Sequence, residues 1–145
     1  MCIRDRPDVE LELGKAYVID EGTDVSIIAC GLEVTEARKA AEKLAEEGIS
    51  AEVIDAFSVK PLDAETILAS LAKTGCAVVA EEHSVYGGLC SAVSELCAES
   101  QPTPLEFVAV RDRFGKSGEF EELMAYFGLD AASIVQAAKK VLMRK

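Results

Sequence analysis

The sequence predicts an α/β fold in which a mainly parallel sheet carries helices on both faces. Apolar runs of strand length alternate with amphipathic stretches of helix length along the 145 residues, as in consecutive strand–helix–strand units. Short continuous apolar runs such as VSIIAC and CAVVA are typical of strands buried on both sides. Because crossovers between parallel strands are right-handed, this alternation determines most of the topology.

The first half of the chain predicts three strands and two helices. The strands are expected at residues 15–20, 25–31 and 50–57. The first helix follows at 33–48, with acidic residues in its first turn and Gly48 after it. Its periodicity predicts an inward face made of Val34, Ala37, Ala41, Leu44 and Ala45. In the second helix Asp63 is the expected N-cap and Gly75 the end, and the expected inward residues are Ile67, Leu68, Leu71 and Ala72.

The second half continues the alternation. A strand at 76–82 leads through a glycine pair into a helix that ends at Ser100, and a strand at 105–110 leads into the polar loop RDRFGKSG. Two helices close the chain at 119–128 and 130–145, the second capped by Asp130. The inward stripe expected of the glycine-entered helix is Leu89, Ala92, Val93, Leu96 and Cys97.

Composition excludes several classes of protein. The formal net charge of −11 opposes nucleic-acid binding, which needs clustered Lys and Arg, and no apolar run has the length of a membrane span. The five cysteines form neither a C-x-x-C pair nor a cluster with zinc spacing. We therefore expect small core thiols in a reducing, cytoplasmic compartment.

The first six residues, MCIRDR, are expected to be a non-native leader. They lack the apolar region and the cleavage site of a signal peptide, and they resemble the read-through of sequencing adapter at the start of some gene models. We therefore expect one domain over residues 7–145, with further sequence of the native protein upstream of Pro7.

Glycine motifs for phosphate binding are incomplete. The turn CGLEVTE has one glycine followed by a glutamate that would repel a pyrophosphate, and no P-loop pattern is present. The pair Gly87 and Gly88 either lets a helix N-terminus approach an anion or only relieves backbone crowding, and we expect the second.

The only histidine, His83, lies in VVAEEHSVYGGL. A general base needs a carboxylate or hydroxyl partner within reach, and adjacent residues of an extended segment point to opposite faces. Glu82 and Ser84 are therefore poor partners, and hydrogen bonding or interface packing is the expected role of His83. The loop RDRFGKSG either binds a phosphate or a partner's carboxylates, or it is a solvated loop in which Phe114 packs down and Ser117 caps the next helix.

Four stretches together resemble the C-terminal domain of the transketolase family, from about Pro7 to the C-terminus. They are DVSIIACGLEVTEARKAAEKL, IDAFSVKPLDAETI, VVAEEHSVYGGLCSAVSEL and VRDRFGKSGEFEELMAYFGLDAASIVQAAKKVL. The closing stretch is most similar to split transketolases and is also similar to 1-deoxy-D-xylulose-5-phosphate synthase. The resemblance implies a three-layer α/β/α sandwich with a five-stranded, mostly parallel sheet, in which residues 15–20 form one antiparallel edge strand.

The resemblance implies an enzyme that transfers a two-carbon ketol unit between sugar phosphates, with thiamine diphosphate and a divalent metal as cofactors. The chain lacks the G-D-G triplet of the diphosphate–metal motif, and in this family that motif belongs to the preceding domains. We therefore expect no catalytic, cofactor-binding or metal-binding residue here, no cofactor bound by this chain alone, and a thiamine-binding partner in a homodimer or heterotetramer. The expected contact residues are His83, Tyr86, Gly87, Gly88 and Phe114.

Three functions remain open. The first is the C-terminal part of a transketolase of carbohydrate metabolism (the pentose phosphate pathway), which serves assembly and is inactive alone. The second is the corresponding part of 1-deoxy-D-xylulose-5-phosphate synthase. The third is a non-catalytic module that binds a small anion at the carboxyl ends of the strands.

Overall fold

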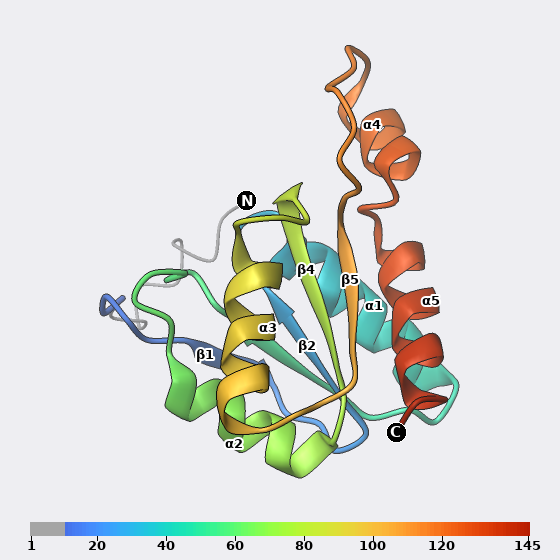
Figure 1. The fold of residues 1–145 in the computed structure, drawn as a ribbon. Helices are drawn as coiled ribbons and strands as arrows, with labels where there is room; N and C mark the ends of the chain where they lie inside the picture. Colours follow the sequence, from blue (N-terminus) through green and yellow to red (C-terminus); the bar gives the residue numbers. More distant parts are fainter. Residues whose placement is uncertain (1–10) are drawn as a thin grey trace.

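The computed structural model describes residues 11–145 as a five-stranded sheet between two layers of helices (Figure 1). The strands are β1 (Tyr17–Asp20), β2 (Val25–Ala29), β3 (Ala51–Asp55), β4 (Ala77–Ser84) and β5 (Leu105–Val110). The helices are α1 (Glu33–Glu46), α2 (Ala64–Thr74), α3 (Leu89–Ser100), α4 (Phe120–Phe127) and α5 (Ala131–Leu142). The predicted leader at residues 1–6 lies outside the described residues.

The sheet is mostly parallel, as predicted. Its strand order is β1-β3-β2-β4-β5. β2 lies parallel to both β3 and β4, and β5 is parallel to β4, whereas β1 pairs with β3 in the antiparallel sense. The antiparallel edge strand is therefore confirmed, at Tyr17–Asp20.

Each face of the sheet has its own apolar core. α1 and α5 cover one face, and α2 and α3 cover the other (Figure 1). The central strand β2 supplies both cores, because successive side chains of a strand alternate between faces: Ile27 packs under α1 and Ile28 under α2. The three-layer sandwich is thus confirmed.

The predicted helix caps are present. The Asp63 carboxylate accepts a hydrogen bond from the Thr66 amide at 3.1 Å, and Gly75 ends α2 in the left-handed conformation with φ 73°. Asp130 likewise accepts from the Ser133 amide at 2.9 Å.

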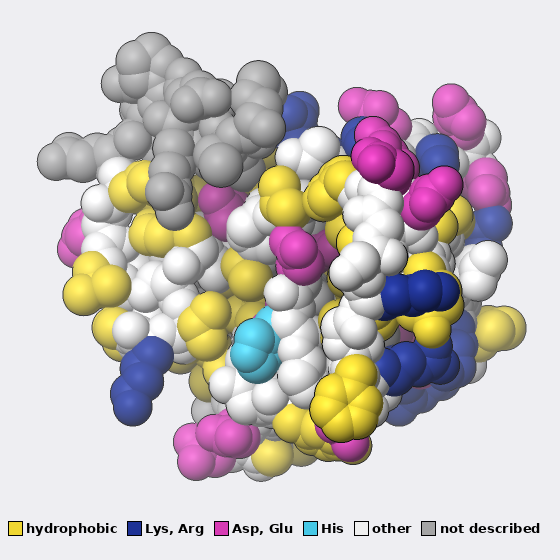
Figure 2. Space-filling view, turned by 90° about the horizontal axis from the view of Figure 1, so that it is seen from above, with side chains coloured by type: hydrophobic (Ala, Val, Ile, Leu, Met, Phe, Trp, Pro, Cys, Tyr) yellow, Lys and Arg dark blue, Asp and Glu magenta, His cyan; other side chains and the backbone are white. Residues whose placement is uncertain are grey.

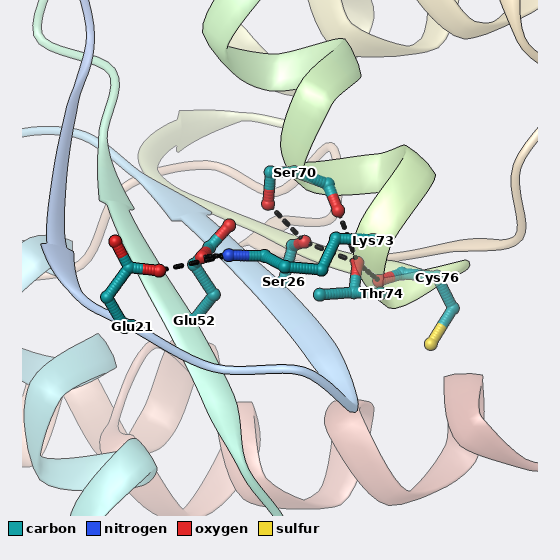
Figure 3. A network of polar contacts seen from close by, with 7 residues as sticks. All are labelled: Glu21, Ser26, Glu52, Ser70, Lys73, Thr74 and Cys76. Atoms are coloured by element: carbon teal, nitrogen blue, oxygen red, sulfur yellow. Dashed lines mark hydrogen bonds and ion pairs between the residues drawn. The ribbon is translucent and has the colours of Figure 1, made fainter.

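Two predicted inward residues, Ala45 and Ala72, are exposed instead. Alanine is weak evidence for a buried face because its small side chain is tolerated on either side of a helix. In α2 the buried positions are taken by the hydroxyl side chains of Ser70 and Thr74, whose oxygens both lie 2.6 Å from the Ser26 hydroxyl of β2 (Figure 3). This network satisfies three buried hydroxyls that an apolar periodicity cannot reveal.

An ion pair continues this attachment of α2 to the sheet (Figure 3). Lys73 of α2 pairs with the buried carboxylate of Glu52 in β3 and, at 3.0 Å, with exposed Glu21. A buried carboxylate is stable only when it is paired, so the ion pair of Lys73 with Glu52 helps to fix the position of α2 on β3.

No helix among the described residues combines the length and apolar character needed to cross a membrane.

Candidate contact face at the carboxyl edge

The loops that follow β2, β3, β4 and β5 meet at one end of the sheet, which we call the carboxyl edge. Figure 1 shows this end at the top, with α4 and the loop before it standing above the rest of the chain. Figure 2 looks onto the carboxyl edge and shows hydrophobic side chains scattered among charged ones. The large hydrophobic residues exposed there include Leu32, Tyr86 and Phe114.

His83 lies in β4 itself, which extends two residues beyond the predicted end at Glu82. Its side chain is largely exposed, and its Nδ1 lies 2.8 Å from the backbone carbonyl oxygen of Ser84. Because a carbonyl only accepts, Nδ1 is the donor of this bond. Among residues 11–145 the carboxylate oxygen paired with it, Oε2 of Glu81, is 4.0 Å away, so His83 has no closely held acid–base partner in this part of the chain.

Glu81 is a buried side chain of this region whose role sequence reasoning missed. It is buried, and its two carboxylate oxygens accept hydrogen bonds from the backbone amides of Leu89 and Cys90, each at 2.8 Å. These amides form the first turn of α3, where unpaired N–H groups and the helix dipole favour an anion. The carboxylate of Glu81 therefore fills the position that an external anion would take.

The glycine pair is explained by the close approach of the Glu81 carboxylate to the backbone before α3. A Cβ atom on Gly88 would lie 2.1 Å from Oε2 of Glu81 and 2.9 Å from Nδ1 of His83, and Gly87 has a positive φ of 83°. The pair thus relieves backbone crowding around an internal carboxylate. Whether Gly87 and Gly88 also touch a partner stays a prediction.

Two further acids are buried at the carboxyl edge. Glu33, the first residue of α1, is 0% exposed, and Asp55, the last residue of β3, is 4% exposed. Burial, and then the negative charges of Glu36, Glu82 and Asp130, raise the pKa of Glu33 to about 8. Burial raises the pKa of Asp55 to about 6. At neutral pH Glu33 is therefore mostly uncharged.

The thiol of Cys30 lies among these acids at the end of β2. Its pKa is raised to about 11 by burial and by the charges of Glu81, Asp55 and Glu33. A thiol with so high a pKa is a poor nucleophile, which agrees with the expectation that the cysteines are core residues. In α3 both Cys90 and Cys97 are buried, as expected of core thiols.

The loop from Arg111 to Gly118 is exposed throughout. The side chain of Phe114 is 100% exposed, so the interpretation in which Phe114 packs onto its own domain is wrong. Ser117 does not cap α4 either: the N-cap residue is Glu119, and it makes no side-chain capping bond. The Lys116 ammonium instead lies 4.4 Å from the ring centre of Tyr126 in α4, a cation–π contact.

A shallow groove of about 330 Å³ lies beside this loop. Tyr86, Phe107 and Arg111 are among the residues that line it, and Tyr86 is 69% exposed. Tyr86 and Phe114 are thus both available for contact, on segments that the sequence had singled out.

The outer edge of β5 is closed by two arginines. Arg111 donates to the carbonyl of Phe107 and Arg144 to the carbonyl of Leu105, each at 2.7 Å. Arg144 is held in place by Glu106 at 2.6 Å. Since unpaired carbonyls at a sheet edge invite another strand, these arginines disfavour strand addition at β5.

The described residues do not match the requirements of a metal–diphosphate site. No group of three or more His, Cys, Asp or Glu side chains in residues 11–145 could hold a metal ion. The amides at the start of α3, which could receive a phosphate, are already bound by Glu81.

Comparison with known proteins places this fold in a family. The family model described as "Transketolase, C-terminal domain" matches residues 14–134. The chain is 50% identical, over 97% of its length, to the 6-deoxy-6-sulfo-D-fructose transketolase subunit SqwH of Clostridium sp.. It is 44% identical, over 94% of its length, to 1-deoxy-D-xylulose-5-phosphate synthase 1 of Geobacter sulfurreducens.

A solved structure of a split-gene transketolase, an inactive β4 tetramer, superposes with a TM-score of 0.92 at 44% identity. The match covers 94% of this chain and 45% of that chain. The chain likewise spans 44% of the Clostridium subunit and 22% of the Geobacter synthase. More than half of each of these proteins thus lies outside the region that the chain matches.

Proposed function

The chain belongs to the transketolase C-terminal domain family, and from this premise we propose that it serves as the assembly part of a thiamine-diphosphate-dependent transketolase. The intact enzyme would transfer a two-carbon ketol unit between sugar phosphates or related ketoses. The observation that carries this proposal is the 50% identity, over 97% of the chain, to a transketolase subunit.

The role within that enzyme is contact rather than chemistry. Thiamine diphosphate and its divalent metal supply the bond-breaking chemistry when bound, and the described residues contain no group of three or more His, Cys, Asp or Glu side chains that could hold the metal. The residues of this chain would instead hold the thiamine-binding part in position. Tyr86 and Phe114 suit this role because exposed aromatic side chains are the common anchors of protein interfaces.

The proposed partner is a thiamine-binding segment of the same enzyme, either on one polypeptide or as a companion subunit. A homodimer or a heterotetramer of the intact enzyme, inactivity of the isolated chain and a cytoplasmic location are parts of this proposal. The β4 assembly of the split-gene transketolase supports self-association of such chains.

A second candidate function is the corresponding part of 1-deoxy-D-xylulose-5-phosphate synthase, supported by 44% identity to the Geobacter protein. A free-standing anion-binding module has less support, because Glu81 already occupies the amides at the start of α3.

The test uses this chain combined with its thiamine-binding half. Two reactions are followed: ketol transfer from a ketose to an aldose phosphate, and formation of 1-deoxy-D-xylulose 5-phosphate. Ketol transfer alone supports the proposal, whereas formation of the deoxy sugar selects the second candidate. If neither reaction occurs although the two parts form a stable complex that binds thiamine diphosphate, both are wrong.

A further inference from the structure

Three buried carboxyl oxygens at the carboxyl edge have no hydrogen-bond partner. They are Oε1 and Oε2 of Glu33 and Oδ1 of Asp55. Among the described residues, no other buried side-chain nitrogen or oxygen lacks a hydrogen-bond partner. An unsatisfied buried polar atom costs roughly 1–3 kcal/mol. Native domains hold few such atoms, and each one calls for an explanation.

The two acids belong to one place in the fold. Asp55 stands opposite Ala29 in the pairing of β3 with β2, and Glu33 begins the helix that follows β2. Both also act on the thiol of Cys30, the residue that directly follows β2. We call the carboxyl groups of Glu33 and Asp55 the acid pair.

The acid pair lies where the connections of the sheet diverge. β2 leads into α1 on one face, whereas its neighbours β3 and β4 lead into α2 and α3 on the other face. In open α/β sheets, the crevice at such a divergence is the usual place of ligand contact. The unpaired oxygens therefore lie at the position in the fold where a partner group is expected.

The chemistry of the acid pair indicates which kind of partner group it would bind. In their ionised forms both acids only accept hydrogen bonds, so a partner that binds these forms must donate. The charges that act on Glu33 from the surrounding elements, α1, β4 and the cap of α5, are all negative: Glu36, Glu82 and Asp130. No three-residue metal group exists among residues 11–145. A guanidinium, which is always charged and donates two parallel hydrogen bonds to a carboxylate, satisfies these conditions best.

We propose that the acid pair receives an arginine side chain from the thiamine-binding part of the assembled enzyme. This inference rests on the proposed assembly role and names the polar anchor of that contact. Three observations argue for this occupant: the exposed apolar side chains of the same edge, the net charge of −11, and the larger part of the relatives' length beyond this chain.

Access requires only a small movement. Glu33 is the first residue of α1 and follows the exposed Gly31 and Leu32. In this proposal, a change of side-chain rotamer at the first residue of the helix would bring its carboxylate to the partner. Binding would then ionise Glu33, and pairing with the guanidinium would offset the cost of burying its negative charge.

The test measures the protonation of Glu33 directly. The chain is labelled with ¹³C, and the side-chain carboxyl resonance of Glu33 is followed against pH in ethylguanidinium chloride and in tetramethylammonium chloride of equal ionic strength. Ethylguanidinium donates hydrogen bonds and tetramethylammonium does not. We expect ethylguanidinium to lower the apparent pKa of Glu33 by about one unit or more from its starting value near 8, while tetramethylammonium leaves it unchanged.

A matched pair of variants completes the test in the assembled enzyme. Glu33→Gln should weaken the association of this chain with the thiamine-binding half about tenfold or more, and Glu46→Gln, on the exposed end of the same helix, should leave it unchanged. An equal response of Glu33 to both salts, or unchanged association of Glu33→Gln, overturns the inference. If in that case removal of Phe114 still weakens association, the assembly role stands without the arginine anchor.

Discussion

Gly88 and Glu81 are coupled: a side chain on Gly88 would occupy the position of the Glu81 carboxylate, with a Cβ-to-Oε2 distance of 2.1 Å. This single contact explains both the glycine pair and the closed N-terminus of α3. It joins the end of β4 to the helix that follows and shapes the loop that carries Tyr86.

The first prediction concerns this coupling. Gly88→Ala should displace Glu81 from the Leu89 and Cys90 amides, and the loss of two charge-assisted hydrogen bonds should lower the free energy of unfolding by about 2–4 kcal/mol. Urea denaturation of the isolated chain measures this free energy of unfolding. Gly115→Ala is the matched control, because a Cβ at Gly115 meets no atom within 4 Å; equal stability losses in the two variants would contradict the explanation.

The second prediction concerns Phe114. Its side chain is fully exposed, so Phe114→Ala should leave the stability of the isolated chain within about 0.5 kcal/mol of the wild type. In the assembled enzyme, loss of an aromatic anchor should raise the Kd for the thiamine-binding half about tenfold. Sedimentation or calorimetry measures the Kd.

The control for Phe114 is Met143→Ala. Met143 is also highly exposed, at 82%, but it follows α5 at the opposite end of the sheet (Figure 1). An unchanged Kd for Phe114→Ala, or an equal rise for both variants, would remove Phe114 from the contact face.

The third prediction concerns His83. Within residues 11–145 His83 lacks a closely held carboxylate partner and should contribute to contact, so His83→Ala should weaken assembly while the assembled enzyme keeps most of its turnover. General acid–base groups contribute roughly 100-fold or more to rate. Steady-state kinetics at saturating partner concentration separates the two effects, and a loss of turnover of that size in a fully assembled variant would show that His83 takes part in the chemistry.

The fourth prediction is a pH dependence of stability. The pKa of Glu33 is raised from 4.5 in the unfolded chain to about 8 in the folded one. Between these pH values the unfolded state has released the proton and the folded state retains it, so stability falls as pH rises, by about 1.4 kcal/mol per pH unit from Glu33 alone. The fall should level off above pH 8.

Denaturation at pH 5 and pH 8 checks this dependence. Glu33→Gln removes the titrating group and should lose less stability than the wild type between the two pH values, whereas Glu46→Gln should behave as the wild type does. Asp55 adds a smaller fall in the same direction, complete by about pH 6. If the wild type instead gained stability between pH 5 and pH 8 compared with Glu33→Gln, the pKa of Glu33 would not be raised in the folded chain.

The fifth prediction concerns the edge of β5. Replacing Arg111 and Arg144 by glutamine removes the charged donors from the carbonyls of Phe107 and Leu105 and should increase self-association through this edge. Light scattering at increasing concentration measures it. Lys116→Gln removes one charge elsewhere on the same loop and should have no such effect; self-association of that variant to the same degree would point to net charge instead.

The sequence predicted much of the fold because local signals and tertiary structure agree there. Buried apolar runs located the strands, and Asp63, Gly75 and Asp130 located helix ends. The inward faces of α1 and α2 were partly wrong because alanine fits either face and because Ser70 and Thr74 are buried by a hydroxyl network with Ser26. Such a network depends on the packing of distant segments and leaves no periodic trace in the sequence.

The arrangement of the carboxyl edge was predicted less completely than the fold. His83, Tyr86 and Phe114 were singled out as lone or aromatic residues in loops, whereas Glu81 was overlooked. Its role depends on the position of α3 relative to β4, which local sequence does not specify. The burial of Glu33 was likewise invisible, since an acidic residue in the first turn of a helix is ordinarily an exposed partner of the helix dipole.

The most direct test of the central claim is a ketol-transfer assay of residues 7–145 alone, with thiamine diphosphate and Mg²⁺, beside the same chain supplemented with its thiamine-binding half. The account predicts no turnover above background for the isolated chain and turnover on mixing. Ketol transfer by the isolated chain would contradict it, because the chemistry would then reside in residues to which we assign only contact.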